Sequence, residues 1–160
     1  MTDYLTGKKA GKGSYFPLRI ASKRAGKPAD EANEHPVLLD PVVGTDTRLL
    51  CFSEDSGSPV PRYGEHEDKW LNQRAADSIH YYHLDEGTWN AERKDLMDAT
   101  QALCADLEKL VAQGQRNTAA YDDAVNTLLE LIDPFSKFSS ACLQVARDRG
   151  LLEEIFPGLQ

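Results

Sequence analysis

The chain has 160 residues, is 41% hydrophobic and 28% charged, and so has the size and composition of an ordinary globular protein of about one domain. Its apolar runs are only a few residues long, which excludes a membrane-spanning helix, and residues 1–9 lack the apolar core of a secretory signal. The three cysteines, Cys51, Cys104 and Cys142, are widely spaced, and we expect reduced, buried thiols in a cytoplasmic protein.

The net charge of −8 is unevenly distributed, because residues 1–30 carry a net +5 and residues 31–160 carry −13. The acidic body would repel a polyanion, so only the N-terminal segment could attract one. We expect weak DNA contact at most, through the basic side chains of that segment: Lys8, Lys9, Lys12, Arg19, Lys23, Arg24 and Lys27. Two alternatives stay open, namely a solvated leader and a leader that docks onto an acidic surface.

Residues 1–34 are rich in glycine, lysine, alanine and serine without a sustained hydrophobic period, which predicts a basic, loop-rich leader. The glycines do not indicate a phosphate-binding loop, because Gly11-Lys12-Gly13-Ser14 has the wrong order and Pro17 would disrupt the required helix. Residues 35–160 are predicted to form a single α+β domain. Within it, Val37–Leu39 and Arg48–Phe52 read as short strands, with turns at residues 41–46 and 55–59.

Beyond residue 68 the pattern predicts four helices. They run from Lys69 to Leu84, from Thr88 as N-cap to Gln113, from Thr118 to Ile132, and from Asp133 as N-cap to Gly150. The residues expected to face inward are Trp70, Leu71, Ala75, Ile79 and Tyr82; Leu96, Leu103, Leu107 and Leu110; Tyr121, Val125, Leu128, Leu129 and Ile132; and Phe138, Cys142 and Val145. The predicted fold class is therefore α+β: a small antiparallel sheet of two or three strands, over about residues 36–63, packed against a four-helix C-terminal half.

Several short motifs occur in serial order along residues 12–150. They include Lys12-Gly13 with Phe16-Pro17, then Leu38-Leu39-Asp40-Pro41, then Ile79 with Leu84, then Arg93, and finally Phe135 within Pro-Phe-Ser. This order resembles one branch of the HNH endonucleases, found in Septu-type and retron-associated antiphage systems. The resemblance implies structural roles for Lys12, Gly13, Phe16, Pro17, Leu38, Leu39, Asp40, Pro41, Ile79, Leu84, Arg93 and Phe135.

In that family the catalytic histidine, the metal-ligand histidine, an asparagine and a Cys-x-x-Cys-Asn element come before the Lys-Gly motif. Residues 1–11 contain no His, Asn or Cys, so the resemblance carries over no catalytic residue. It implies a non-catalytic remnant or C-terminal part of an antiphage defence nuclease, which supports the nuclease core and docks onto a partner such as an ATPase subunit. No cofactor is expected, and a divalent metal and endonuclease activity are implied only if the missing motif is present in the parent protein.

Two other functions stay open: a metal-dependent HNH-like endonuclease with a drifted motif, and an acidic protein-interaction module or inhibitor. His80 and His83 would share a helix face and are weak candidate metal ligands if a third ligand arrives from elsewhere. The alternative is that they lie at the edge of the core with their polar tips in water. Arg93 is expected to be a structural ion-pair partner or hydrogen-bond donor.

Overall fold

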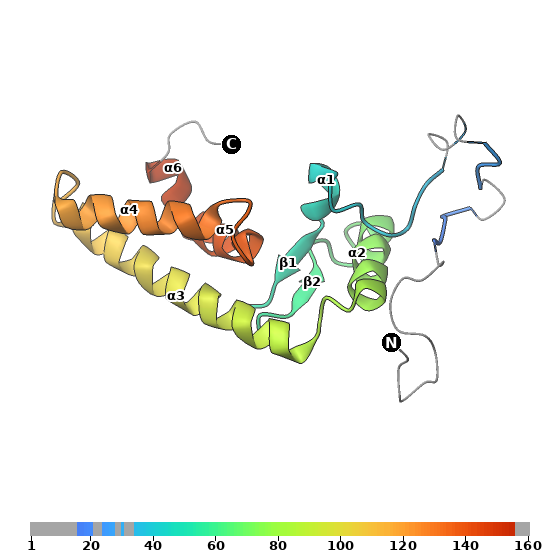
Figure 1. Cartoon of the computed structure of the whole chain (residues 1–160), viewed down its shortest axis with the longest axis horizontal. Coiled ribbons are helices and arrows are strands. Elements are labelled where there is room, and N and C mark those ends of the chain that lie inside the picture. Colours follow the sequence, from blue (N-terminus) through green and yellow to red (C-terminus); the bar gives the residue numbers. More distant parts are fainter. Residues whose placement is uncertain (1–15, 21–23, 28–29, 31–33, 156–160) are drawn as a thin grey trace. The chain divides into compact units, whose positions relative to one another are not determined.

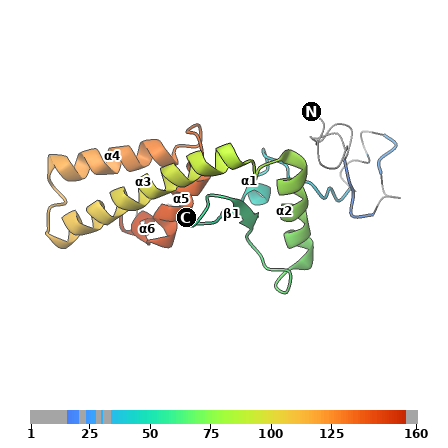
Figure 2. The ribbon, with the colours of Figure 1, turned by 90° about the horizontal axis from the view of Figure 1, so that it is seen from below.

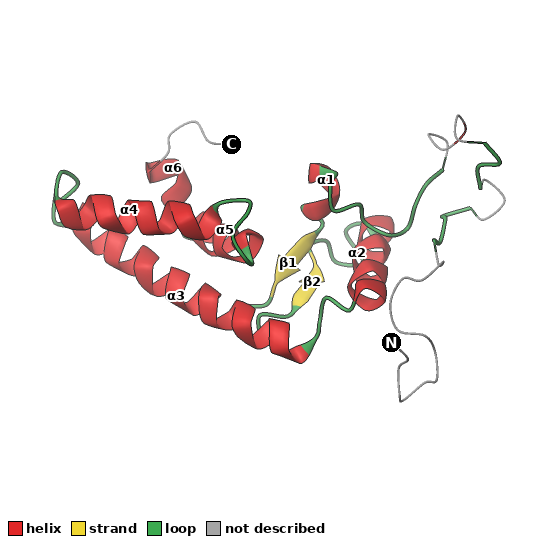
Figure 3. Cartoon of the chain, in the orientation of Figure 1, coloured by secondary structure: helices red, strands yellow, loops and turns green. Residues whose placement is uncertain are grey.

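The computed structural model describes residues 16–20, 24–27, 30 and 34–155 (Figure 1). The elements in these ranges are α1 (Gly44–Thr47), β1 (Leu50–Phe52), β2 (Pro59–Pro61), α2 (Lys69–Tyr82), α3 (Gly87–Ala112), α4 (Ala119–Ile132), α5 (Ser139–Asp148) and α6 (Leu151–Ile155) (Figure 3). The predicted α+β class with a helical C-terminal half is confirmed. None of the helices within the described ranges is long and apolar enough to cross a membrane.

The elements belong to two compact units. Unit 1 comprises residues 1–51 and 59–87, and unit 2 comprises residues 52–58 and 88–160. The hairpin of β1 and β2 thus belongs mainly to unit 1, whereas its turn belongs to unit 2. That residues 35–160 form a single domain stays a prediction.

The sheet is an antiparallel pair of β1 and β2, and the prediction that Val37–Leu39 forms a strand is wrong. Pro36 makes only an isolated antiparallel bridge with Leu18, and Val37 donates its N–H to the carbonyl oxygen of Pro17. The N–H of Leu39 donates instead to the hydroxyl of Ser78 on α2, at 2.8 Å. A side chain of a helix therefore takes the place that a neighbouring strand would have, and the apolar run is buried without joining the sheet.

Unit 1 is built around α2, which packs against β2. Its apolar cluster consists of Leu39, Leu49 and Ala75, with Leu50 and Leu71 at its edge. The carboxylate of Asp68 caps the start of α2 by accepting the N–H groups of Trp70 and Leu71, both at 3.0 Å. The helix ends at His83, which adopts a left-handed conformation with φ of 54°. The predicted helix is thus confirmed, two residues shorter than expected.

In unit 2, α3 and α4 run side by side, with α5 and α6 beside them (Figures 1 and 2). Helix α4 packs on α5, and α5 packs on α6. The main core cluster draws residues from all four helices: Cys104, Leu107, Leu128, Ala146 and Leu151. A second cluster joins Phe52 and Phe138 to Met97, Ala141 and Val145. The buried Cys104 and Cys142 and the half-buried Cys51 are free thiols, as the sequence predicts.

The buried line of α3 differs from the predicted leucine stripe. It runs through Arg93, Met97, Thr100, Cys104 and Leu107, so only Leu107 of the predicted residues is fully buried. Thr100 is tolerated there because its hydroxyl donates to a carbonyl one turn earlier in the same helix, at 2.7 Å. A pattern of leucines misses such a line, since two of its five residues, Arg93 and Thr100, are polar or charged.

Three details of the predicted helix ends and faces are wrong. Helix α3 begins at Gly87, so Thr88 lies inside it and is not its N-cap. Asp133 follows the last residue of α4 and does not start the next helix, because α5 begins only at Ser139. The residue before a proline is driven toward extended conformations, and Asp133 has ψ of 132°, which ends α4. After it, the N–H of Ser136 donates to the carbonyl oxygen of Asp133 in a turn that does not continue as a helix. Leu129 was expected to face inward, but its side chain is 40% exposed.

The turn of the hairpin is fixed on the first turns of α3 within unit 2. The guanidinium of Arg93 donates to the carbonyl oxygen of Gly57 and to Asn90 Oδ1. Gly57 has φ of +67°, and an added Cβ would lie 2.4 Å from the carbonyl oxygen of Asn90. The amide of Gln144 on α5 pairs with both backbone polar groups of Phe52, at 2.9 Å each. A glycine and three polar side chains therefore attach this turn to the helices.

Candidate functional site

The most exposed large apolar side chains of the described residues lie in two short loops. The first, the Val42 corner, comprises residues 40–43. The N–H of Val42 donates to Asp40 Oδ1 at 3.0 Å, and the N–H of Val43 donates to the carbonyl oxygen of Asp40 at 3.1 Å. Pro41, which lies between Asp40 and Val42, has its φ angle fixed by its ring. The side chain of Val42 is 88% exposed, although its backbone is firmly hydrogen-bonded.

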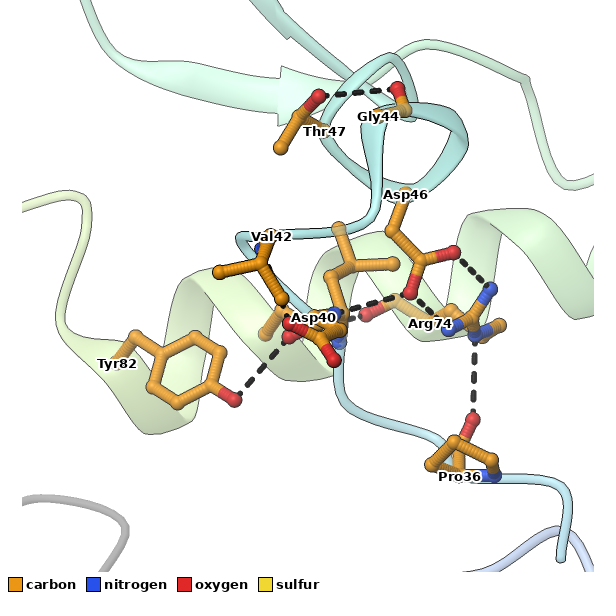
Figure 4. Close-up of polar contacts among 10 residues, drawn as sticks. Pro36, Asp40, Val42, Gly44, Asp46, Thr47, Arg74 and Tyr82 are labelled. Carbon is orange, nitrogen blue, oxygen red and sulfur yellow. Dashed lines mark hydrogen bonds and ion pairs between the residues drawn. The ribbon is translucent and has the colours of Figure 1, made fainter. Parts of the chain in front are cut away.

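An ion pair between Asp46 and Arg74 holds the start of the Val42 corner (Figure 4). Both guanidinium NH₂ groups of Arg74 donate to the carboxylate of Asp46, at 2.9 and 2.6 Å, and its Nε donates to the carbonyl oxygen of Pro36. The same carboxylate accepts the N–H of Asp40 at 2.9 Å. Burial alone would raise the pKa of Asp46, but the bonds from Arg74 and Asp40 and the charge of Arg74 hold it below its ordinary value.

The second loop, the Phe135 corner, comprises residues 133–136. The N–H of Phe135 donates to Asp133 Oδ1 at 2.9 Å, and the N–H of Ser136 donates to the carbonyl oxygen of Asp133 at 2.8 Å. The hydroxyl of Ser136 donates to the carbonyl oxygen of Glu130 on α4, at 2.6 Å. The ring of Phe135 is nonetheless 99% exposed.

The two corners have the same construction. In each, an Asp-Pro pair leads to an apolar residue whose N–H donates to the aspartate side chain two positions earlier. Such a turn fixes the direction in which the third residue points. An apolar side chain that is ordered in this way but left in water contributes nothing to the stability of the chain through its own burial. This arrangement suits a contact with another molecule.

Charge distinguishes the Phe135 corner. Glu130 and Asp133 are both exposed and are close to Phe135 in the sequence. Asp122 and Asp123 are exposed at the other end of α4. Lys137 is the one basic residue between 118 and 137, and it is ion-paired with Glu92. The segment that presents Phe135 is therefore acidic and would be complementary to a basic surface.

Arg93 is buried in this structure. Its side chain is only 5% exposed, and its guanidinium lies 4.9 Å from the ring centroids of both Phe52 and Phe138. Burial lowers its pKa, and its donors are directed to Gly57 and Asn90. Arg93 thus donates hydrogen bonds to the hairpin turn and to its own helix, and its structural role stays a prediction.

His80 and His83 are both exposed near the end of α2, and no group of three or more metal-ligating side chains occurs among the described residues. Burial raises the pKa of the Cys104 thiol, which makes it a poor nucleophile or ligand. The described part of the chain thus brings together no side-chain group suited to a metal ion.

Of the basic residues expected to contact DNA, Lys8, Lys9, Lys12 and Lys23 lie outside the described residues. Arg24 donates to the carbonyl oxygen of Phe16, and Lys27 is exposed. Arg19 lies over the indole ring of Trp70, with its guanidinium carbon 4.8 Å from the ring centroid. The sequence did not predict this pairing, because it joins residues of the leader to a residue assigned to the buried stripe.

The residues implied by the family resemblance have varied environments. Leu38 and Leu39 are buried; Phe16, Pro17, Ile79 and Leu84 are half-buried; Asp40 and Pro41 are exposed; and Lys12 and Gly13 lie outside the described residues. Leu39 is tied to α2 twice, by Ser78 and by the hydroxyl of Tyr82, which donates to its carbonyl oxygen. Phe135 is exposed and contributes to the structure only through the backbone of its corner.

Comparison of the chain with models of protein families, with curated proteins and with solved structures finds no match. The signal that sequence reasoning overlooked is the repeated Asp-Pro-apolar triplet at residues 40–42 and 133–135. The second triplet was assigned to a helix start, and its exposed ring was consequently not anticipated.

Proposed function

We propose that the chain is a non-catalytic docking module, which binds a protein partner through the Phe135 corner. The observation that carries the proposal is a phenylalanine ring that is 99% exposed on a backbone fixed by three hydrogen bonds. Aromatic side chains are enriched at protein interfaces, and phenylalanine is among the residues most often fully buried. Because the corner is already ordered, binding would cost little conformational entropy there.

The chemistry around the ring indicates the kind of partner. Glu130 and Asp133 are exposed beside Phe135 in the sequence, and both leave charge available, since Ser136 uses only the main chain of Glu130. We therefore propose a partner surface with an apolar pocket for the ring and lysine or arginine side chains at its rim. This role agrees with the one implied by the resemblance to Septu-type and retron-associated nucleases, in which the partner would be an ATPase subunit.

The proposal is tested by affinity purification of the tagged chain from cells that carry its gene. The wild-type chain should retain a stoichiometric partner, and Phe135→Asp should lose it. Asn126→Asp, at an exposed position of α4, adds the same charge to the same unit and serves as the matched control. Retention of the partner by Phe135→Asp, or equal loss in both variants, would refute docking at this corner.

The contribution of the acidic side chains to binding is tested separately. Asp133→Asn keeps a side-chain oxygen that accepts the N–H of Phe135, and Glu130→Gln leaves the carbonyl bonded by Ser136 in place. The double variant therefore removes two charges without changing the corner. With the purified partner, it should lower the association rate constant at low salt and weaken the salt dependence of that rate. An unchanged salt dependence would mean that the rim of the partner is not basic.

The proposal assigns no DNA cleavage to this chain. With magnesium, manganese or zinc present, it should leave both plasmid and single-stranded DNA intact. Cleavage that disappears in His80→Ala or His83→Ala would replace this proposal with a metal-dependent nuclease.

A further inference from the structure

A second surface, on unit 1, combines positive charge with an aromatic ring. A groove of about 290 Å³ is lined by Leu18, Arg19, Val37, Lys69, Trp70 and Gln73. The backbone around Leu18 is fixed by its bridge with Pro36 and by the N–H of Arg19, which donates to the carbonyl oxygen of His35 at 2.9 Å. The other wall is the first turn of α2.

We propose that this groove binds single-stranded nucleic acid. Lys69 and Arg19 are exposed and would bind the backbone phosphates, while Trp70 would stack against a base. Arg19 lies over the indole of Trp70, and a guanidinium in a cation–π contact still has N–H donors for a phosphate. A positive groove with an aromatic platform is the arrangement by which single strands are bound without sequence preference.

The two basic side chains of the groove are available to an anion in spite of the acidic chain. Asp68 is the nearest acid to Lys69 in the sequence, and its carboxylate is directed to the start of α2, where it accepts the N–H groups of Trp70 and Leu71. Among the described residues, neither Arg19 nor Lys69 forms an ion pair. A duplex is a poorer ligand than a single strand, because paired bases hide their faces from an indole.

The chain contains two tryptophans, and Trp89→Phe leaves Trp70 as the only one, so its fluorescence reports on this groove. Oligo(dT) of about twelve nucleotides, within the range of known single-strand sites, should quench it at low salt. With the same oligonucleotide labelled with fluorescein, anisotropy gives the dissociation constant. Lys69→Gln and Arg19→Gln should each flatten the plot of log K against log salt by about 0.7. Arg48→Gln removes a charge from another exposed position of unit 1 and should leave the slope unchanged.

The stacking contribution is measured by replacing Trp70. Trp70→Ala should weaken binding by about 5- to 150-fold, and Trp70→Phe should restore most of it, with circular dichroism to check that α2 is retained. Phe135→Asp should leave binding unchanged, so this inference and the proposed docking function fail separately.

Four results would overturn the inference: no binding at about 50 mM salt, equal binding of a duplex, equal effects of Arg48→Gln and Lys69→Gln, or equal quenching by poly-glutamate. The last result would identify a general groove for acidic polymers, including acidic peptides.

Discussion

Unit 1 has a small apolar cluster, Leu39, Leu49 and Ala75, and its loops are fastened to α2 by polar groups such as the ion pair of Asp46 and Arg74. Unit 2 has two apolar clusters, the larger of which draws on α3, α4, α5 and α6. Over its full length, unit 1 carries eleven basic and twelve acidic side chains, a net −1, whereas unit 2 carries seven and fourteen, a net −7. The proposed nucleic-acid groove therefore lies on the nearly neutral unit, and the proposed docking corner for a basic partner lies on the acidic unit.

The largest expected effect concerns the apolar core of unit 2. Leu107 is 0% exposed at the centre of its cluster, so Leu107→Ala should lower the free energy of unfolding by about 2–5 kcal/mol through lost burial and a cavity. Denaturant unfolding followed by Trp89, in a Trp70→Phe background, reports on this unit. Leu129→Ala, at a half-exposed leucine of α4, is the control and should cost well under half as much. Equal costs would show that the apolar core is not what holds unit 2 together.

A smaller effect is expected where the hairpin turn lies on α3. Gly57→Ala must accept both a positive φ and a Cβ in collision with the backbone of Asn90 and Lys94, and should cost about 2–3 kcal/mol. Gly114 has a similar φ of +71°, but a Cβ added there meets open space. The loss of stability in Gly114→Ala, about 1 kcal/mol, therefore measures the cost of the positive φ alone. If the two variants unfold at the same denaturant concentration, the close approach of this turn to α3 is wrong.

The polar network of unit 1 should make the stability of this unit depend on pH. The apolar core of unit 2 predicts no such dependence. The pKa of Asp46 in the folded chain is below its ordinary value. Its contribution to the free energy of unfolding is therefore complete above the pKa of an aspartate in the unfolded chain, about 3.9, and is lost as the pH falls through the lower folded value. Unfolding followed by Trp70, in a Trp89→Phe background, should show this loss below about pH 4. Asp46→Asn should be less stable at pH 7 and should show a weaker acid dependence.

The matched ion pair in unit 2 sharpens this prediction. Arg149 donates to the carboxylate of Glu108, which lowers the pKa of that group, but both side chains are partly exposed. Solvent screens such pairs, so Glu108→Gln should change stability by less than about 1 kcal/mol at pH 7. A larger effect in Glu108→Gln than in Asp46→Asn would reverse the comparison between the units.

The smallest expected effect is at the docking corner. Because the ring of Phe135 is exposed, Phe135→Asp should change the free energy of unfolding by no more than about 0.5 kcal/mol. A thermal or denaturant melt of the two proteins provides the measurement. A cost of about 2 kcal/mol or more would mean that the ring is buried against the chain itself, and the docking proposal would lose its basis.

The sequence predicted the helices, which follow a regular apolar periodicity. It failed where a hydrogen bond from a side chain takes the place of backbone pairing. Helix α4 spans Ala119–Ile132 where the pattern predicts a helix from Thr118 to Ile132, and Thr118 lies one position before it as the N-cap. The apolar run Val37–Leu39 resembles a strand, because any buried segment gives the same run. The N–H of Leu39 donates to the hydroxyl of Ser78, 39 positions away, and no local pattern reveals such a partner. Asp133-Pro134 fits a helix start and a turn equally well, because in both the aspartate side chain can accept the N–H of Phe135. Only the following residues distinguish them, since the next helix, α5, begins at Ser139.

The same reasons apply to the candidate sites. Charge counting identified the basic N-terminal segment but could not place Arg19 over Trp70, since the pairing depends on the bridge between Leu18 and Pro36. Exposure of an aromatic side chain cannot be read from its type. It follows from the direction in which a turn points it, and that direction is set here by three hydrogen bonds of the Phe135 corner.

The central claim is that the ring of Phe135 enters an apolar pocket on a basic partner, and site-specific photo-crosslinking tests it most directly. A benzoylphenylalanine replaces Phe135 in one protein and Asn126 in the other, and both are irradiated in cells that carry the gene. We expect one dominant crosslinked protein from position 135, with the linked peptide apolar and flanked by lysine or arginine, and little product from position 126. Equal yields from the two positions, or a linked peptide rich in acidic residues, would contradict the account.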